Sequence, residues 1–88
     1  MAKRVKLEII KDILKIIQDN NEIKPTPLLR KSNLSSQRFS EYLKELLEKE
    51  FVIYVTDKKS KMIRLTERGS RFLEKYKTII GFIEEFEL

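Results

Sequence analysis

Polar and basic side chains gather between residues 36 and 44, and the chemistry open to them is hydrogen bonding to a polyanion. The candidates are Ser36, Gln37, Arg38, Ser40 and Lys44. Arg38 and Gln37 carry planar groups that can form paired hydrogen bonds with guanine and adenine edges. The serines and Lys44 suit phosphates better, because a hydroxyl or a flexible ammonium has no such planar fork. The alternative is that all five are ordinary solvated helix residues.

A second basic group lies between residues 51 and 65. Its charged members are Asp57, Lys58, Lys59, Lys61 and Arg64. One acidic residue among four basic ones makes this segment suitable for lying along a phosphate backbone or a minor groove. Further candidate phosphate contacts are Lys3, Arg4, Lys6, Arg30 and Lys31.

The inventory of reactive side chains argues against an enzyme. The sequence has no His, no Cys and two Gly, and therefore lacks a thiolate metal site and a glycine-rich phosphate loop. Most carboxylates lie beside Lys or Arg, as in ordinary pairs along a helix. We expect no catalytic residue, no cofactor and no metal.

Helices before residue 50 must position the first polar group. Residues 5 to 20 repeat apolar side chains at three- and four-residue spacing, which predicts a helix with one buried face. The asparagines that follow suit a left-handed cap. A second helix is expected from about Pro27 to Lys31, with Thr26 as its cap.

A polar turn over residues 32 to 35 leads into the third helix. Leu34 is expected to enter the core, and Ser35 or Ser36 to cap the helix that runs to about Lys49. Its apolar stripe consists of Phe39, Tyr42, Leu43, Leu46 and Leu47. The polar candidates lie on the opposite side of this helix.

A hairpin and a last helix complete the chain. The segments 51 to 56 and 61 to 66 are rich in β-branched residues and flank the turn residues DKKS, which predicts two strands joined tightly. From its cap at Thr66, the last helix is expected to reach about Phe86.

This order of elements resembles the small archaeal winged helix-turn-helix DNA-binding proteins. The resemblance rests on NLSSQRFSEYLKELLEKEFVI and on IRLTERGSRFLEKY. It is closest to the group that dimerises through a C-terminal antiparallel coiled-coil helix. The implied fold is mainly α with a β-hairpin wing: residues 1 to 66 form the DNA-binding unit, and 67 to 88 the dimerisation helix.

The chain departs from this family at the end of the third helix. Glu50 occupies the position where such proteins commonly have a glycine in a left-handed conformation, so either the connection differs or Glu50 is strained. The wing also lacks glycine, which predicts a short tip.

The last helix carries an apolar seam that predicts pairing with a second copy. Its expected interface residues are Tyr76, Ile79, Ile80, Phe82, Ile83 and Phe86. The alternative is that this seam folds back onto the first helix of a monomer. Gly81, inside the helix, is consistent with a close approach of two helices.

The net charge of +5 favours a polyanionic partner. We therefore expect a homodimer that binds double-stranded DNA in the cytoplasm, associated with the nucleoid and without a membrane partner. It would act in transcription regulation or as an architectural protein. The alternative functions are a winged-helix module for protein–protein interaction and a chromatin- or RNA-associated protein without sequence specificity.

Overall fold

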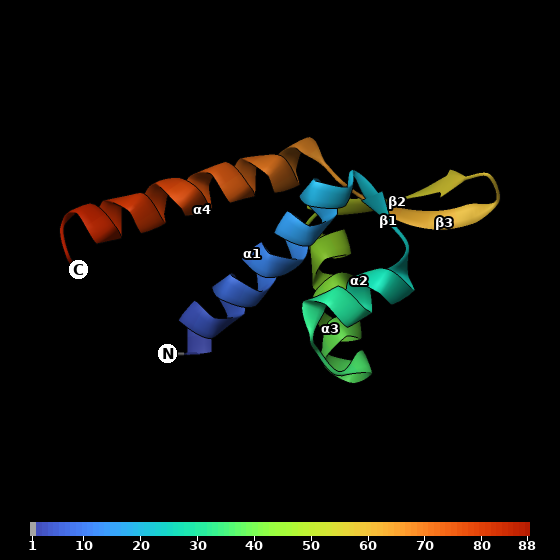
Figure 1. Cartoon of the computed structure of the whole chain (residues 1–88), viewed down its shortest axis with the longest axis horizontal. Helices are drawn as coiled ribbons and strands as arrows, with labels where there is room; N and C mark the ends of the chain where they lie inside the picture. The colour runs from blue at the N-terminus through green and yellow to red at the C-terminus, as the bar shows by residue number, and fades with distance from the viewer. Residues whose placement is uncertain (1) are drawn as a thin grey trace.

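The computed structural model describes residues 2–88, with side chains described from residue 6 onward. Four helices pack at the base of one small sheet whose hairpin projects to one side. The molecule measures 48 × 26 × 21 Å because the wing and the last helix extend in opposite directions (Figure 1). In the described chain, no helix is long and apolar enough to cross a membrane. The fold is mainly helical with a winged hairpin, as predicted.

The first two helices frame one side of the core. Helix α1 spans Ala2–Asn20 and ends at Asn21, which has the predicted left-handed conformation with φ of 62°. Helix α2 spans Pro25–Ser32, so its predicted start at Pro27 was wrong, as was the predicted cap. Lys24 precedes the helix without a side-chain cap. Both prolines fit in the first turn, where backbone N–H groups have no partner within the helix.

Helix α3 spans Ser36–Glu48 and has well-defined signals at both ends. The hydroxyl of Ser35 accepts a hydrogen bond of 3.2 Å from the backbone N–H of Arg38, which confirms the predicted cap. At the other end, Glu50 has a φ of 60° and its N–H donates to the carbonyl of Leu47. Phe51 N–H donates to the carbonyl of Leu46. These two bonds form a Schellman motif with Glu50 in the place that favours glycine.

The sheet has three antiparallel strands in the order β1-β3-β2. Strand β1 spans Glu22–Ile23, a segment for which the sequence predicted no strand. Strand β2 spans Val52–Asp57 and β3 spans Ser60–Leu65. The hairpin turn has two residues, which agrees with the predicted short tip, but the strands extend into the DKKS segment that was expected to form the turn. Lys58 and Lys59 have φ of 49° and 71°, which is the pattern of a type I′ turn.

Helix α4 spans Glu67–Glu85 and starts at the predicted cap, because the Thr66 hydroxyl accepts a hydrogen bond of 3.0 Å from the Gly69 N–H. Its first turns pack closely on the base of the wing. A Cβ placed on Gly69 would lie 2.3 Å from the carbonyl oxygen of Phe51, so glycine is required for this approach.

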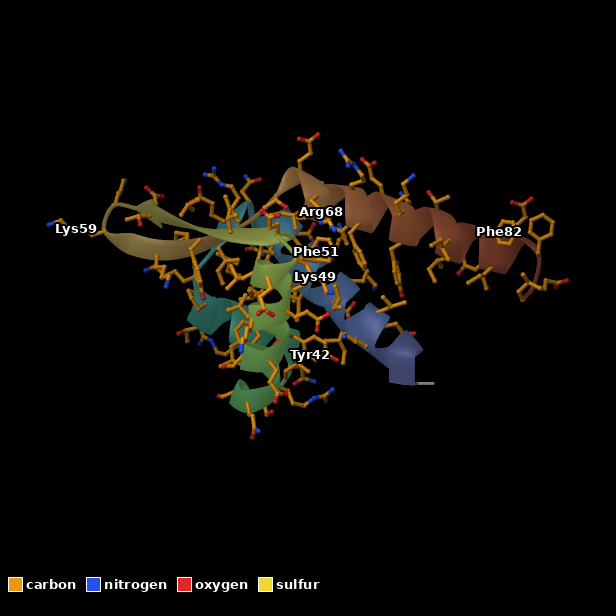
Figure 2. The ribbon with its side chains drawn as sticks, turned by 180° about the vertical axis from the view of Figure 1, so that it is seen from behind. Tyr42, Lys49, Phe51, Lys59, Arg68 and Phe82 are labelled. Atoms are coloured by element: carbon orange, nitrogen blue, oxygen red, sulfur yellow. The ribbon has the colours of Figure 1, made fainter. Side chains whose placement is uncertain are left out.

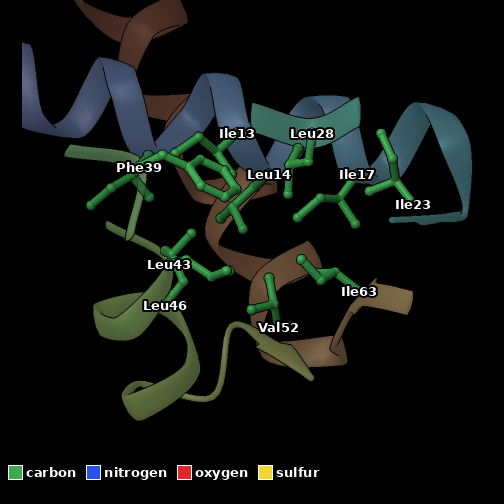
Figure 3. Packing of buried hydrophobic residues seen from close by; sticks show 11 residues of the cluster. Ile13, Leu14, Ile17, Ile23, Leu28, Phe39, Leu43, Leu46, Val52 and Ile63 are labelled. Atoms are coloured by element: carbon green, nitrogen blue, oxygen red, sulfur yellow. The ribbon is translucent and has the colours of Figure 1, made fainter. Parts of the chain in front are cut away.

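One apolar core joins the helices to the inner face of the sheet (Figure 3). Leu14, Ile17, Leu28, Leu46 and Ile63 have no exposed surface. Leu34 is partly buried against this cluster, which confirms its predicted inward orientation. Because α1, α2, α3 and all three strands contribute buried side chains, the core holds α3 at a fixed position relative to the wing.

Candidate nucleic-acid interface

The polar side of α3 faces solvent. The five predicted side chains on it are exposed: Ser36, Gln37, Arg38, Ser40 and Lys44. Phe39, Leu43 and Leu46 anchor the opposite side, with at most 8% of each residue exposed. Because its buried side is anchored in the core, α3 presents its hydrogen-bonding groups from a fixed position, as a helix that binds in a DNA groove requires.

Carboxylates share the exposed side of α3 with the polar candidates. Glu41 and Glu48 are both exposed, and successive helical residues are about 100° apart, which groups them with Gln37 and Lys44 at the centre of that side. Arg38 lies toward the flank. It lines a shallow hollow of about 280 Å³ with Lys6, Glu41, Tyr42 and Glu45.

Lys6 is tied to this flank by an intramolecular ion pair. Its Nζ lies 3.1 Å from Glu45 Oε2, and Lys49 Nζ lies 3.9 Å from the same oxygen. Both lysines are about half exposed in these pairs, so a phosphate can compete for them at small cost. The other predicted amino-terminal contacts, Lys3 and Arg4, lie outside the residues whose side chains are described.

The last turn of α2 adds two exposed cations, Arg30 and Lys31. Positive charges are favourable at a helix C-terminus, so these side chains also stabilise α2. The chain then turns at Asn33, which is left-handed with φ of 60°, and enters α3. The two cations thus lie just before the turn that leads to the polar side of α3.

The wing presents its lysines at and near its tip. Lys58 and Lys59 form the turn and are exposed, and Lys61 Nζ lies 3.9 Å from the centre of the Tyr54 ring. Arg64 is held at the base of the wing by an ion pair with Glu22 of β1. The four basic side chains therefore differ in their surroundings: Lys58 and Lys59 are exposed on a turn, whereas Lys61 and Arg64 have local partners.

The side-chain view shows how these groups are distributed. Lys59 marks the wing tip and Phe82 the far end of α4, at opposite ends of the molecule, while Tyr42 lies on α3 between them (Figure 2). The predicted polar candidates thus gather on α2, α3 and the wing, away from the end of α4. The sequence did not reveal the contact of Tyr54 with Lys61 or the ion pair of Glu22 with Arg64, because both depend on strand register. The length of the hairpin turn sets the register of β2 and β3. The two-residue strand β1 is too short to show a periodic pattern.

The structure places five of the six predicted interface residues of α4 in two sets and leaves the sixth, Ile83, half-buried. Ile79, Phe82 and Phe86 are exposed by 57%, 55% and 56%. Tyr76 and Ile80 instead line a groove of about 500 Å³ between α1 and α4.

Lys11 and Lys15 form the α1 side of this groove. The ion pair of Lys11 with Asp12, at 2.8 Å, raises the pKa of the Lys11 ammonium. The exposed side chains of Ile79, Phe82 and Phe86 thus form a surface separate from the groove between α1 and α4. A second copy of the chain could cover these three side chains without filling the groove.

Among the described side chains, no group of three or more His, Cys, Asp or Glu is arranged to hold a metal ion. Among those side chains, no buried polar atom lacks a hydrogen-bond partner. Among the described residues, no polar or charged side chain is buried, so these groups lie at or near the surface.

Comparison with known proteins gives a family model and several related structures. A family model described as winged helix-turn-helix matches residues 3–84. The uncharacterized protein MJ0290 of Methanocaldococcus jannaschii is 35% identical over 82 residues, which cover 93% of this chain and 36% of that protein. The chain therefore spans about a third of this relative's length.

Solved structures share the fold over most of the chain. SSV1 F-93 has a TM-score of 0.69 and 27% identity, covering 89% of this chain and 91% of its own. The Sulfolobus solfataricus DNA-binding protein Sso10a-2 has a TM-score of 0.74 and 20% identity, covering 92% and 83%. The oxidized form of MarR from E. coli has a TM-score of 0.74 and 17% identity, covering 92% and 69%.

Proposed function

The chain belongs to the winged helix-turn-helix family, and from that premise we propose that it binds double-stranded DNA as a homodimer and regulates transcription. The observation that carries the proposal is the exposed polar side of α3 beside a lysine-tipped wing. In this arrangement the first turns of α3 enter the major groove and the wing lies along the neighbouring backbone. Sso10a-2, which shares the fold, is itself a DNA-binding protein.

The distribution of charge assigns different roles in DNA binding to α3 and to the neighbouring elements. Residues 36 to 49 carry three basic and three acidic side chains, so α3 adds no net attraction to phosphate. Attraction comes instead from the wing and from α2. Glu41 and Glu48 repel phosphates and can accept hydrogen bonds from cytosine amino groups. Helix α3 therefore contributes more to base recognition than to electrostatic affinity.

Pairing of two copies through α4 accounts for its exposed apolar side chains. The order of charges along the helix favours an antiparallel pair. Residues 67 to 77 carry four basic and two acidic side chains, a net charge of +2, whereas residues 84 to 87 carry three acidic side chains and no basic one. In an antiparallel pair, each acidic end faces the partner's basic half; a parallel pair would bring like charges together. We accordingly propose residues 67 to 88 as the dimerisation segment and residues 1 to 66 as the DNA-binding unit.

A DNA partner implies a cytoplasmic, nucleoid-associated protein, and family membership supports a role without catalysis. Labelled duplexes of random and defined sequence, titrated at several salt concentrations, test the proposal. We expect the logarithm of the binding constant to fall steeply with the logarithm of salt. A large ratio between defined and random sequences would identify a regulator of particular promoters. Absence of binding to every duplex overturns the proposal.

Two variants distinguish base recognition from phosphate binding in the same titration. Arg38→Ala is expected to lose about 1–3 kcal/mol of discrimination at one base pair with little change in the salt slope. Lys59→Ala is expected to weaken binding to all sequences and to lower the slope by about 1. If Arg38→Ala instead weakened all sequences equally, Arg38 would be assigned to a phosphate.

The second candidate is a winged-helix module that binds protein. The two central carboxylates on α3, Glu41 and Glu48, favour it, because a basic partner surface would pair with them. This function predicts weak, sequence-blind affinity for DNA. The same titration therefore distinguishes the two.

A further inference from the structure

One lysine of the wing is held in place by an aromatic ring. Lys61 Nζ lies 3.9 Å from the centroid of the Tyr54 ring, within the range of a cation–π interaction. Tyr54 is on β2 and Lys61 on β3, so the contact crosses the hairpin. In the register of these strands, Tyr54 pairs with Ile63 and Lys61 with Thr56, which makes Tyr54 and Lys61 diagonal neighbours.

The pleat of the sheet fixes the side on which this pair lies. Directly opposed residues project from the same face, and side chains alternate along a strand. Tyr54 and Lys61 thus share a face with Ile63, which is fully buried against the helices. Arg64 and Ile53 project from the other face. The ammonium of Lys61 is therefore on the face of the hairpin turned toward the helical layer that contains α3.

We propose that Lys61 binds a backbone phosphate of the DNA that α3 reads, and that Tyr54 is the positioning residue that aims its ammonium; this inference rests on the proposed function. Tyr54 is 37% exposed and Lys61 is exposed, so a phosphate can reach the cation without displacing the ring. The ring uses only one side of the ammonium, which leaves N–H donors for phosphate oxygens.

A positioned lysine differs from the two lysines at the tip. A free lysine side chain loses rotamer freedom when it binds, whereas Lys61 is already restrained by the ring. Lys58 and Lys59 lie on the turn, and within the described residues no aromatic ring holds either ammonium. Lys61 is therefore expected to contribute more affinity than either tip lysine, although each carries the same charge.

The test is a double-mutant cycle on DNA binding, with the full chain and one duplex at several salt concentrations. Lys61→Ala should weaken binding and lower the salt slope by about 0.9, the loss of one phosphate contact. Tyr54→Leu should weaken binding roughly threefold or more, and should have no further effect in the Lys61→Ala background. Tyr54→Phe keeps the ring and should bind within about twofold of the wild type.

Ile53→Ala is the matched control, because Ile53 is on the neighbouring position of β2, is 43% exposed and projects from the other face. It should leave binding unchanged. Thermal melts of each variant exclude loss of the fold as the cause.

If wild-type protein binds no duplex, the proposed function fails. If wild-type protein binds but Tyr54→Leu matches it, or weakens binding equally with and without Lys61, this inference fails and the proposed function stands. Failure of Tyr54→Phe to restore binding also overturns the positioning role.

Discussion

The hydroxyl of Thr66 donates a hydrogen bond of 2.6 Å to the main-chain carbonyl of Glu50, which is 16 residues earlier in the chain. The same hydroxyl accepts from the Gly69 N–H at 3.0 Å, and the Thr66 N–H donates to the Phe51 carbonyl at 3.0 Å. Thr66 therefore closes the base of the wing and joins the end of α3 to the start of α4. These bonds restrain the direction of α4 relative to the end of α3.

This double role of the Thr66 hydroxyl predicts a measurable cost for its removal. Thr66→Val keeps the shape of the side chain but loses both hydrogen bonds, and should lower the free energy of unfolding by about 1–2 kcal/mol. Thr66→Ser keeps the hydroxyl and should stay close to the wild type. Urea denaturation measures both variants; equal losses would show that shape and not hydrogen bonding matters at this position.

The left-handed conformation of Glu50, with φ of 60°, predicts a stabilising substitution. Glu50→Gly removes the clash of Cβ with the backbone and should raise the free energy of unfolding by about 1 kcal/mol. The hydrogen bond from Thr66 is unaffected because it uses the main-chain carbonyl. A melting temperature that is unchanged or lower would show that the end of α3 is not strained.

The two glycines of α4 should respond in opposite directions to alanine. Gly69→Ala brings a Cβ to 2.3 Å from a backbone oxygen, and overpacking of this kind costs about 3 kcal/mol. Gly81→Ala meets nothing within 4 Å and should gain about 1 kcal/mol from helix propensity. A loss of stability or of dimerisation in Gly81→Ala would instead place a second copy against that position.

The type I′ turn of the wing predicts a conflict between stability and binding. Lys58→Asn combined with Lys59→Gly supplies the residues that this turn favours, and should stabilise the fold by about 1 kcal/mol. The same change removes two cations and should lower the salt slope of DNA binding by roughly 1.8. Unchanged binding would show that the tip does not reach the DNA.

Exposed Phe82 and half-buried Ile83 on α4 predict a dimer that one introduced charge can disrupt. Phe82→Glu and Ile83→Glu should each yield monomers in sedimentation velocity, because a carboxylate would be buried without a partner at the interface. Thr78→Glu is the control, since Thr78 is an exposed polar position on the same helix. Variants that remain dimeric would remove the interface assignment.

The sequence allowed most of the fold to be predicted, because periodicity and capping residues mark the helices. Ser35 and Thr66 were recognisable as caps, and the spacing of Phe39, Leu43 and Leu46 marked the buried side of α3. The sequence did not reveal β1, since a two-residue strand has no pattern and exists only through its pairing with β3. The start of α2 was misplaced because Thr26 looked like a cap, whereas Pro25 already occupies the first helical position.

The candidate site was predictable in its residue types but not in its contacts. Exposure of the polar side of α3 follows from the burial of the opposite side. The pairing of Lys6 with Glu45, by contrast, brings together residues from different helices. The contact of Lys61 with Tyr54 depends on strand register, which is set by whether the turn has two residues or more.

The hydrogen bonds around Thr66 also bear on the spacing of DNA half-sites that a dimer could bind. Because they fix α4 to the end of α3, the crossing of two α4 helices would set the distance and the rotational phase between two reading helices. Half-sites would then have to recur on one face of the duplex, at about 10–10.5 base pairs or a multiple of it. An insertion of half a helical turn of DNA between the half-sites would place one of them on the opposite face of the duplex. The dimer could then contact the bases of only one half-site at a time.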